Sequence, residues 1–189
     1  MRLLFNCFLF CLLTYSCSSG DEMKRQLEKM YGTPVSISLD SMKYWHPTDE
    51  DYSSKKENSM LTLVVYSDTA DCSLCYLQHL ELWNDFVKME KEYDGIIRFL
   101  FIIEARDGEA NNLYRQLRHT NLKHCIYVDG NRVFSKNNPQ IPPNSFFHTF
   151  LLDELNNIIL VGNPIKNEAI EKIFKRKIKA KIDSLIIRK

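Results

Sequence analysis

Two runs of apolar residues, separated by a helical pattern, constrain the fold of this chain most strongly. Residues 60–67 read MLTLVVYS and residues 96–103 read IIRFLFII. Continuous apolar runs of this length, rich in β-branched residues, are typical of strands that are buried on both faces of a sheet. Because such a sheet needs helices on both faces, the sequence predicts an α/β fold.

A helix is expected between the two runs. Across residues 76–93 the apolar side chains recur mostly at helical spacing, and Gly95 follows as a helix-ending residue. We interpret Trp83, and likewise Trp45 earlier in the chain, as packing residues. The apolar set of this helix is Leu77, Leu80, Leu82, Trp83, Phe86, Val87 and Met89.

The other segments alternate between strand and helix until the chain closes with a hairpin and a last helix. Alternating strands and helices require right-handed crossovers, and the hairpin adds antiparallel strands. The predicted elements are a helix at 21–31, a strand at 35–39, a polar loop at 46–59, a helix at 108–119 with Leu113, Tyr114 and Leu117 on one side, a strand at 124–129, an antiparallel hairpin formed by 146–153 and 157–162, and a helix at 166–184.

The N-terminus has the pattern of a secretory signal. Arg2 is followed by an apolar run from Leu3 to Leu13 and then by small polar residues up to Cys17. The run is too short to span a bilayer as a stable helix. The residues before Cys17 resemble the lipobox of bacterial lipoproteins, which implies that Cys17 carries lipid. An ordinary signal peptide with an incidental cysteine is the alternative.

The lipoprotein resemblance divides the chain and gives it a location. It implies a signal peptide at 1–16, a tether and short N-terminal helix at 17–34, and one domain at 35–189. We expect a lipid-anchored protein of the cell envelope that faces the periplasm. Residues 18–22 also resemble a weak form of the surface-export signal of Bacteroidetes lipoproteins, so exposure on the cell surface is a second option.

The cysteine count changes once the signal is removed. Cys7 and Cys11 leave with it and Cys17 would carry lipid, so only Cys72, Cys75 and Cys125 remain as thiols. An odd number argues against a purely structural disulfide framework. Cys72 and Cys75 form a C-x-x-C directly after the first buried strand. In an oxidising envelope such a pair can cycle only if a partner reduces it again.

Other interpretations of the cysteines stay open at this point. A zinc site needs four ligands, and the C-x-x-C supplies two. His124 and Cys125 are adjacent, but neighbours on a strand point to opposite faces, which disfavours a shared ion. Cys72 and Cys75 could also be an inert pair. Cys125 is interpreted as a small buried thiol, with a redox role as the alternative, and His79 as a surface histidine.

Charge excludes one class of function. The chain has 25 Lys and Arg against 24 Asp and Glu, a formal net charge of +1, so no overall field attracts nucleic acid. The C-terminal KIFKRKIKAKIDSLIIRK mixes basic and apolar residues at helical spacing, which predicts a helix with one packed and one solvated face. A membrane-surface role for the basic face is an alternative.

In order and spacing, these segments resemble the thioredoxin fold, and more closely the TlpA and ResA type of thiol-disulfide oxidoreductase found among Bacteroidetes lipoproteins. The resemblance covers roughly residues 35–180. It implies a thioredoxin-like fold whose central mixed sheet has about five strands, with helices on both faces. The residues that carry it are LVVYSDTADCSLC, IIRFLFII, CIYVDG and HTFLLDELNNIILVGNP.

The resemblance also implies a site and its partners. Cys72 would be the nucleophile, because the first thiol at a helix start is exposed and lies near free backbone N–H groups that stabilise thiolate. Cys75 would be the resolving thiol. No cofactor and no metal are implied. The expected partners are thiols or disulfides of envelope proteins and a membrane or periplasmic reductant, with no nucleic acid.

The sequence departs from the family pattern in the residues around the cysteines. Asp71 precedes Cys72, where the family usually has an aromatic residue or alanine, and the motif lacks an internal proline. The position of the family's cis-proline falls on Phe147, while Pro142 and Pro143 come four or five residues early. These departures keep a second hypothesis open, a non-catalytic thioredoxin-fold lipoprotein that binds a partner or ligand.

A peroxidase is the third hypothesis. Residues 69–72 match the T-x-x-C of peroxiredoxins, in which a threonine and an arginine hold peroxide against the thiolate. Val65 stands where those enzymes have a proline. Arg98 or Arg106 would have to supply the guanidinium.

The acidic residues beside the motif predict the redox behaviour of the pair. Carboxylates close to a thiol raise its pKa, and Asp71 directly precedes Cys72, with Asp68 slightly further away. We therefore expect a more reducing couple than the strongly oxidising members of the fold. Redox titration of the purified protein measures this, and a midpoint potential near about −120 mV would contradict it.

Overall fold

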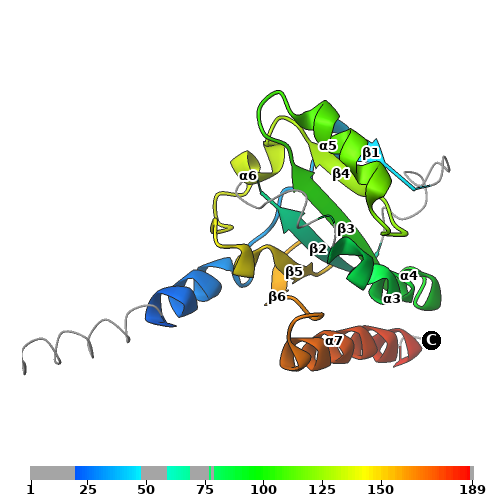
Figure 1. Ribbon diagram of the computed structural model, residues 1–189. Coiled ribbons are helices and arrows are strands. Elements are labelled where there is room, and N and C mark those ends of the chain that lie inside the picture. Colours follow the sequence, from blue (N-terminus) through cyan, green and yellow to red (C-terminus); the bar gives the residue numbers. More distant parts are fainter. Residues whose placement is uncertain (1–19, 48–58, 69–76, 78, 188–189) are drawn as a thin grey trace, which may run out of the picture.

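The computed structural model describes residues 20–47, 59–68, 77 and 79–187 (Figure 1). Its strands are β1 (Lys43–Trp45), β2 (Leu61–Ser67), β3 (Ile97–Glu104), β4 (Ile126–Asp129), β5 (Thr149–Leu152) and β6 (Ile158–Val161). They form one six-stranded sheet in the order β1-β4-β3-β2-β5-β6. Strands β2, β3 and β4 are parallel, and the other three pair antiparallel to their neighbours. The predicted mixed sheet is confirmed, with six strands where about five were expected.

Helices connect the parallel strands and close the chain. The 3-10 and α-helical segments are a helix at 20–30, η1 (Leu39–Ser41), η2 (Leu80–Trp83), α3 (Asn84–Val87), α4 (Met89–Glu92), α5 (Ala110–Gln116), η3 (Leu117–His119), α6 (Val133–Asn137), η4 (Ser145–Phe147) and α7 (Glu168–Ile187). Parallel strands joined through helices, followed by a β-hairpin and a last helix, make up the predicted thioredoxin-like fold.

The pair β2 and β3 forms the centre of the sheet. Their register runs without a break from Leu61 opposite Ile97 to Ser67 opposite Ile103. Every residue of β2 is buried. Because successive side chains of a strand point to opposite faces, this pair contributes to two separate hydrophobic clusters, one on each face of the sheet.

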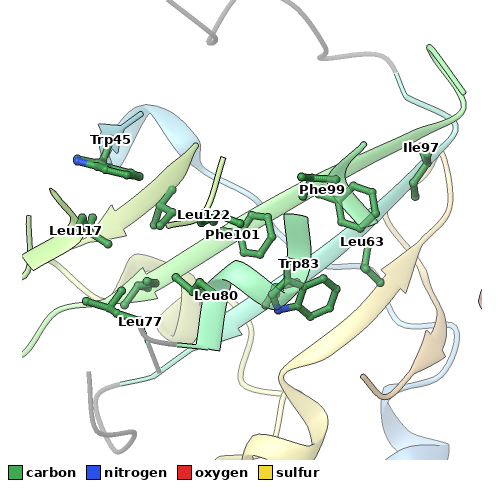
Figure 2. Close-up of a cluster of buried hydrophobic side chains, with 14 of the residues drawn as sticks. Trp45, Leu63, Leu77, Leu80, Trp83, Ile97, Phe99, Phe101, Leu117 and Leu122 are labelled. Atoms are coloured by element: carbon green, nitrogen blue, oxygen red, sulfur yellow. The ribbon is translucent and has the colours of Figure 1, made fainter. Parts of the chain in front are cut away.

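The first cluster lies under η2, α3, α5 and α7. Trp83 contacts Phe99 and Phe101 edge-on, with ring centroids 6.5 Å and 5.8 Å apart (Figure 2). Trp45 packs into the same cluster from β1. Both tryptophans are buried, at 4% and 6% exposure, which confirms their prediction as packing residues.

The second cluster lies on the other face of the sheet. Met30 from the helix at 20–30, Phe134 from α6 and Phe147 from η4 cover residues of β2, β3 and β5 there. All three side chains are at most 1% exposed. Helix α6 was not predicted from the sequence, and it is this helix that brings Phe134 to the end of β2.

The last helix was predicted almost completely. Asn167 caps it, because its Oδ1 accepts hydrogen bonds from the backbone N–H of Ala169 and Ile170. Phe174 and Ile178 are buried against the first cluster. The helix runs three residues beyond the predicted end at Ser184, to Ile187.

The strand predicted at 35–39 is wrong. Val35 is buried, as an alternating strand pattern requires. The backbone of Ser36, however, makes its hydrogen bonds with the side chain of Asn138 and not with another strand. The Ser36 N–H donates to Asn138 Oδ1 and the Ser36 carbonyl accepts from Nδ2, both at 2.8 Å. A side chain thus replaces a neighbouring strand, and the first strand forms later, at β1.

The helix predicted at 76–93 is broken into short pieces. Within the described part it consists of η2, α3 and α4, with helical geometry also at Leu77 and His79. Leu82, predicted on the packed side, is 55% exposed, while Glu90 is buried. The 3-10 turn explains the first difference, because it advances fewer residues per turn than an α-helix and rotates Leu82 outward. His79 is exposed, as predicted.

Glu90, His124 and Cys125 form a buried polar cluster at the amino end of β4. The His124 Nε2 lies 3.2 Å from a Glu90 carboxylate oxygen, and its Nδ1 lies 3.1 Å from the Cys125 carbonyl oxygen. The other Glu90 oxygen accepts a hydrogen bond from the Phe99 N–H. Since both ring nitrogens face acceptors, the imidazole is held as a charged donor to both.

Cys125 is a buried free thiol, as predicted, but its expected geometry was wrong. Its Sγ lies 3.5 Å from His124 Nδ1, so the two side chains do not point to opposite faces. The reason is that β4 begins only at Ile126, and the alternation of a strand does not apply to the two residues before it.

The Glu90–His124 ion pair should make stability depend on pH. Burial alone would lower the pKa of His124, but its hydrogen bonds to Cys125 and Glu90 and their charges raise it to about 10 from the usual 6.5. A raised pKa stabilises the fold fully below the unfolded value, and this contribution is lost as pH rises through the folded value. At about pH 6, His124→Leu should lower the free energy of unfolding by about 3–5 kcal/mol, because it leaves Glu90 buried without its partner.

Urea unfolding of both proteins between pH 6 and pH 10 tests this. The difference between wild type and His124→Leu should shrink as pH rises. His79→Leu, at an exposed position, serves as the matched control and should change stability by less than about 0.5 kcal/mol. A difference that stays constant over the whole range would contradict a charged His124.

Candidate functional site

The predicted redox cysteines lie outside the described residues. Cys72 and Cys75 belong to the stretch 69–76, together with Thr69 and Asp71. The predicted lipidation residue Cys17 also lies outside, in the stretch 1–19. The residues described on either side of the C-x-x-C stretch are Asp68, which follows β2, and Leu77, which is buried in the first cluster.

A cavity of about 240 Å³ lies at the carboxyl ends of β2 and β3. Figure 1 shows α6 beside the arrowhead of β2, and both elements contribute to the lining. In open α/β sheets this edge is where ligands bind. The polar side chains around the cavity include Tyr66, Asp68, Glu104, Ser135, Asn138 and His148.

Tyr66 and Glu104 form a hydrogen-bonded pair in this cavity. They lie at the carboxyl ends of the neighbouring parallel strands β2 and β3 and are 4% and 5% exposed. The Tyr66 hydroxyl donates to the Glu104 carboxylate, and the backbone N–H of Ser135 donates to Glu104 Oε1 at 3.1 Å. Burial, together with the negative charge of Glu104, raises the pKa of Tyr66 far above its usual value. Tyr66 therefore stays a hydrogen-bond donor at any physiological pH.

The position of Ser135 depends on the turn after β4. Asp129 is fully buried and accepts hydrogen bonds from the backbone N–H of Asn131 and of Phe134. These bonds hold the turn that leads from β4 into α6, which begins at Val133. The Phe134 ring then packs on Tyr66 with centroids 4.9 Å apart, which brings the N–H of Ser135 to Glu104.

His148 closes the cavity from the side of β5. Its ring lies 4.7 Å from the Tyr66 ring, and its Nε2–H donates to the Pro142 carbonyl at 3.0 Å. Its backbone carbonyl accepts from the Tyr66 N–H at 2.8 Å. The imidazole is only 3% exposed, and its Nδ1 is buried with no hydrogen-bond partner among the described residues.

The segment before β5 differs from the strand predicted there. Residues 145–147 form η4, and β5 begins only at Thr149. Phe147, on which the cis-proline position falls, is fully buried in the second cluster. No cis peptide bond occurs in the described part of the chain. Pro142 and Pro143, although early in sequence, both line the cavity.

The two arginines considered for a peroxidase lie at different ends of β3. Arg98 is near its amino end and donates to Thr62 Oγ1 on β2. Six residues separate it from Glu104, which corresponds to about 20 Å along a strand. Arg98 is therefore remote from the carboxyl edge of the sheet. Arg106 follows β3 at that edge and is exposed.

Glu104 and His148 were not predicted as site residues from the sequence. A signal for Glu104 was present, because an acidic residue directly ends the second buried apolar run just as Ser67 and Asp68 end the first. Carboxyl ends of adjacent parallel strands meet at one edge. His148 gave no such signal, since its contacts with Tyr66 and Pro142 depend on how the chain folds between β4 and β5.

The described ranges contain neither a metal-binding cluster nor a membrane-spanning helix. No three His, Cys, Asp or Glu side chains in them come together closely enough to hold a metal ion. None of the helices in these ranges is both long enough and apolar enough to cross a membrane.

Comparison with known proteins gives distant structural likenesses only. No protein-family model matches the sequence, and no curated protein matches it. A thioredoxin-like protein in its oxidised form is similar in structure, with a TM-score of 0.49 and 12% identity, over 80% of this chain and 98% of the other.

Two further solved structures are similar at the same level. One is a putative thiol:disulfide interchange protein DsbE from Chlorobium tepidum, with a TM-score of 0.46 and 15% identity over 64% of this chain and 82% of the other. The other is a domain of a possible thiol-disulfide isomerase from Cytophaga hutchinsonii, with a TM-score of 0.45 and 13% identity over 79% of this chain and 96% of the other. The strand order and connections of this chain, described above, are what identify the thioredoxin-like fold.

Proposed function

We propose that this protein is a thiol-disulfide oxidoreductase of the cell envelope that acts through Cys72 and Cys75. One observation carries the proposal. The C-x-x-C occurs in the short stretch between Asp68, which follows the central strand β2, and Leu77, a buried residue of the following helical segment. The carboxyl end of a central parallel strand is where an α/β sheet offers a reactive group to a ligand.

The proposed reaction is two successive thiol-disulfide exchanges. The Cys72 thiolate attacks one sulfur of a partner disulfide, forms a mixed disulfide and releases the other partner sulfur as a thiolate, which takes up a proton. The Cys75 thiolate then attacks the Cys72 sulfur and releases the second partner thiol. Two electrons pass to the partner, and Cys72 and Cys75 are left as a disulfide.

The pair needs a second partner to complete its cycle. An envelope dithiol or a membrane reductant would reduce the Cys72–Cys75 disulfide by the same exchange in reverse. The proposed partners are thus protein thiols or disulfides of the envelope. No cofactor enters this scheme, because both electrons are carried by the sulfur atoms.

A second candidate function is binding of a partner without turnover. Phe147 supports it, because a buried phenylalanine stands where the related oxidoreductases have the proline next to their cysteines. A protein of this kind would keep the fold and the cavity but not exchange electrons. Trapping of reaction intermediates separates the two functions.

Replacing one cysteine at a time should trap partners. In Cys75→Ser the mixed disulfide through Cys72 cannot be resolved, so covalent complexes should accumulate in cells. Cys72→Ser should trap fewer covalent complexes, and these should be linked through Cys75. Non-reducing electrophoresis of alkylated extracts measures both, and wild-type protein should catalyse reduction of insulin by dithiothreitol.

Cys125→Ser is the matched control. Because Cys125 is 3% exposed, this variant should trap nothing and keep the wild-type insulin activity. If neither Cys72→Ser nor Cys75→Ser traps a partner, and the wild-type pair never changes its oxidation state in cells, the binding function is correct.

We also propose that Cys17 anchors the protein by lipid, so that the domain faces the periplasm or the cell surface. The support is the signal-like N-terminus that ends at this cysteine. A radiolabelled fatty acid should be incorporated into the wild-type protein and not into Cys17→Ala. Label that persists in Cys17→Ala would rule out this anchor.

A further inference from the structure

The cavity at the carboxyl ends of β2 and β3 contains a buried negative charge without a positive partner. Glu104 is 5% exposed. Its hydrogen bonds come from the Tyr66 hydroxyl and the Ser135 backbone N–H, which are both neutral donors. No lysine or arginine of the described chain pairs with it. A carboxylate buried without a cation is expensive in free energy, so such a group is rarely kept without a role.

His148 lines the same cavity and carries a buried hydrogen-bond acceptor. Because its Nε2–H donates to the Pro142 carbonyl, the neutral ring has its lone pair on Nδ1. That atom is buried and has no hydrogen-bond partner in the described structure. A buried acceptor that lacks a donor costs about 1–3 kcal/mol. Glu104 and His148 thus both lack what a positively charged hydrogen-bond donor would supply.

The polar donors around the cavity are already used within the protein. The Asn138 amide donates to the backbone carbonyls of Ser36 and Phe134. The Arg132 guanidinium makes two 2.8 Å hydrogen bonds to the Asp107 carboxylate. The Asn138 amide and the Arg132 guanidinium, which both line the cavity, are thus bound to other groups of the protein and not to Glu104.

We propose that this cavity binds an alkylammonium or guanidinium group, with Glu104 as its counter-ion and His148 Nδ1 as an additional acceptor. Apolar atoms of Phe134, Pro142 and Pro143 in the lining would contact the carbon chain of the ligand. An organic cation fits better than a metal ion, because no three ligating side chains converge in the described residues.

The source of the cation follows from the proposed function, on which this step rests. The cavity lies at the same sheet edge as Asp68, just before the C-x-x-C stretch. A protein substrate that brings its disulfide to this edge could place a neighbouring lysine or arginine in the cavity. We infer that the substrates carry a basic side chain close to the reactive cysteine.

Binding of a small cation tests the site directly. The full-length protein, labelled with ¹⁵N at histidine, is titrated with n-butylammonium and, as the neutral comparison, with n-butanol. The His148 Nδ1 signal should move with n-butylammonium only. The dissociation constant should rise at least tenfold in Glu104→Gln, which keeps the shape and the hydrogen-bond acceptor but removes the charge.

Glu154→Gln is the matched control, because this glutamate is on the surface and pairs with Lys181. It should bind n-butylammonium as wild type does. If Glu104→Gln does not fold, the wild-type comparison of n-butylammonium with n-butanol still decides. Equal effects of the two compounds, or no movement of the His148 signal, would show that the cavity holds only water and overturn the proposal.

Two peptides separate a protein-borne cation from a free amine. Both contain the same disulfide, and they differ in one neighbouring residue, lysine in one and norleucine in the other. The wild-type protein should reduce the lysine peptide about tenfold faster in kcat/KM, and Glu104→Gln should lose this preference. Binding of n-butylammonium without a peptide preference would indicate a free amine as ligand and overturn the substrate inference.

A variant without the two proposed redox cysteines tests the cation site independently of the redox function. In a Cys72→Ser, Cys75→Ser double variant, n-butylammonium should bind with the wild-type dissociation constant, since neither cysteine takes part in the cation site. If binding persists there while the wild-type protein shows no disulfide exchange, the redox function fails and the cation site stands. Loss of binding in this variant would contradict the site as described.

Discussion

The whole structure depends on the burial of two parallel strands on both of their faces. All seven residues of β2 are buried, and only Arg98 of β3 is partly exposed. A strand pair of this kind leaves no room for chemistry along its length, because an unpaired polar group there would lose its hydration. Polar side chains are therefore confined to the strand ends. At the carboxyl end they include Tyr66, Asp68 and Glu104, which line the candidate site.

The same burial explains which parts of the fold could be predicted. The two central strands, the hairpin and α7 were predicted because each has a continuous or periodic apolar pattern that is set by local sequence. The strand predicted at 35–39 has such a pattern too, but its backbone is satisfied by Asn138, a residue about 100 positions away. No local pattern contains that contact. The unpredicted helix α6 likewise depends on Asp129, whose side chain accepts the N–H of Phe134.

The candidate site was predictable only in part, for the same reason. A C-x-x-C after a buried strand can be read from the sequence, and it indicates the sheet edge at which a reactive group would lie. The cavity beside that edge cannot be predicted from a local sequence pattern. It requires β2 and β3 to be in register, α6 to reach back to Tyr66, and His148 to pack beside Tyr66. His148 is therefore found only once the chain is folded, whereas Glu104 is marked in the sequence as the acidic residue that ends the second buried run.

The acidic character of this edge links the two proposals. Carboxylates close to a thiol disfavour its thiolate, so in the proposed function Asp68 and Asp71 would favour a reducing pair that reacts slowly on its own. A basic side chain of a substrate in the cavity would offset the Glu104 charge at the time when the disulfide arrives. Reactivity would then rise for substrates that carry a cation in the right place and stay low for others. In this view, one negative sheet edge both keeps the pair reducing and selects its substrates.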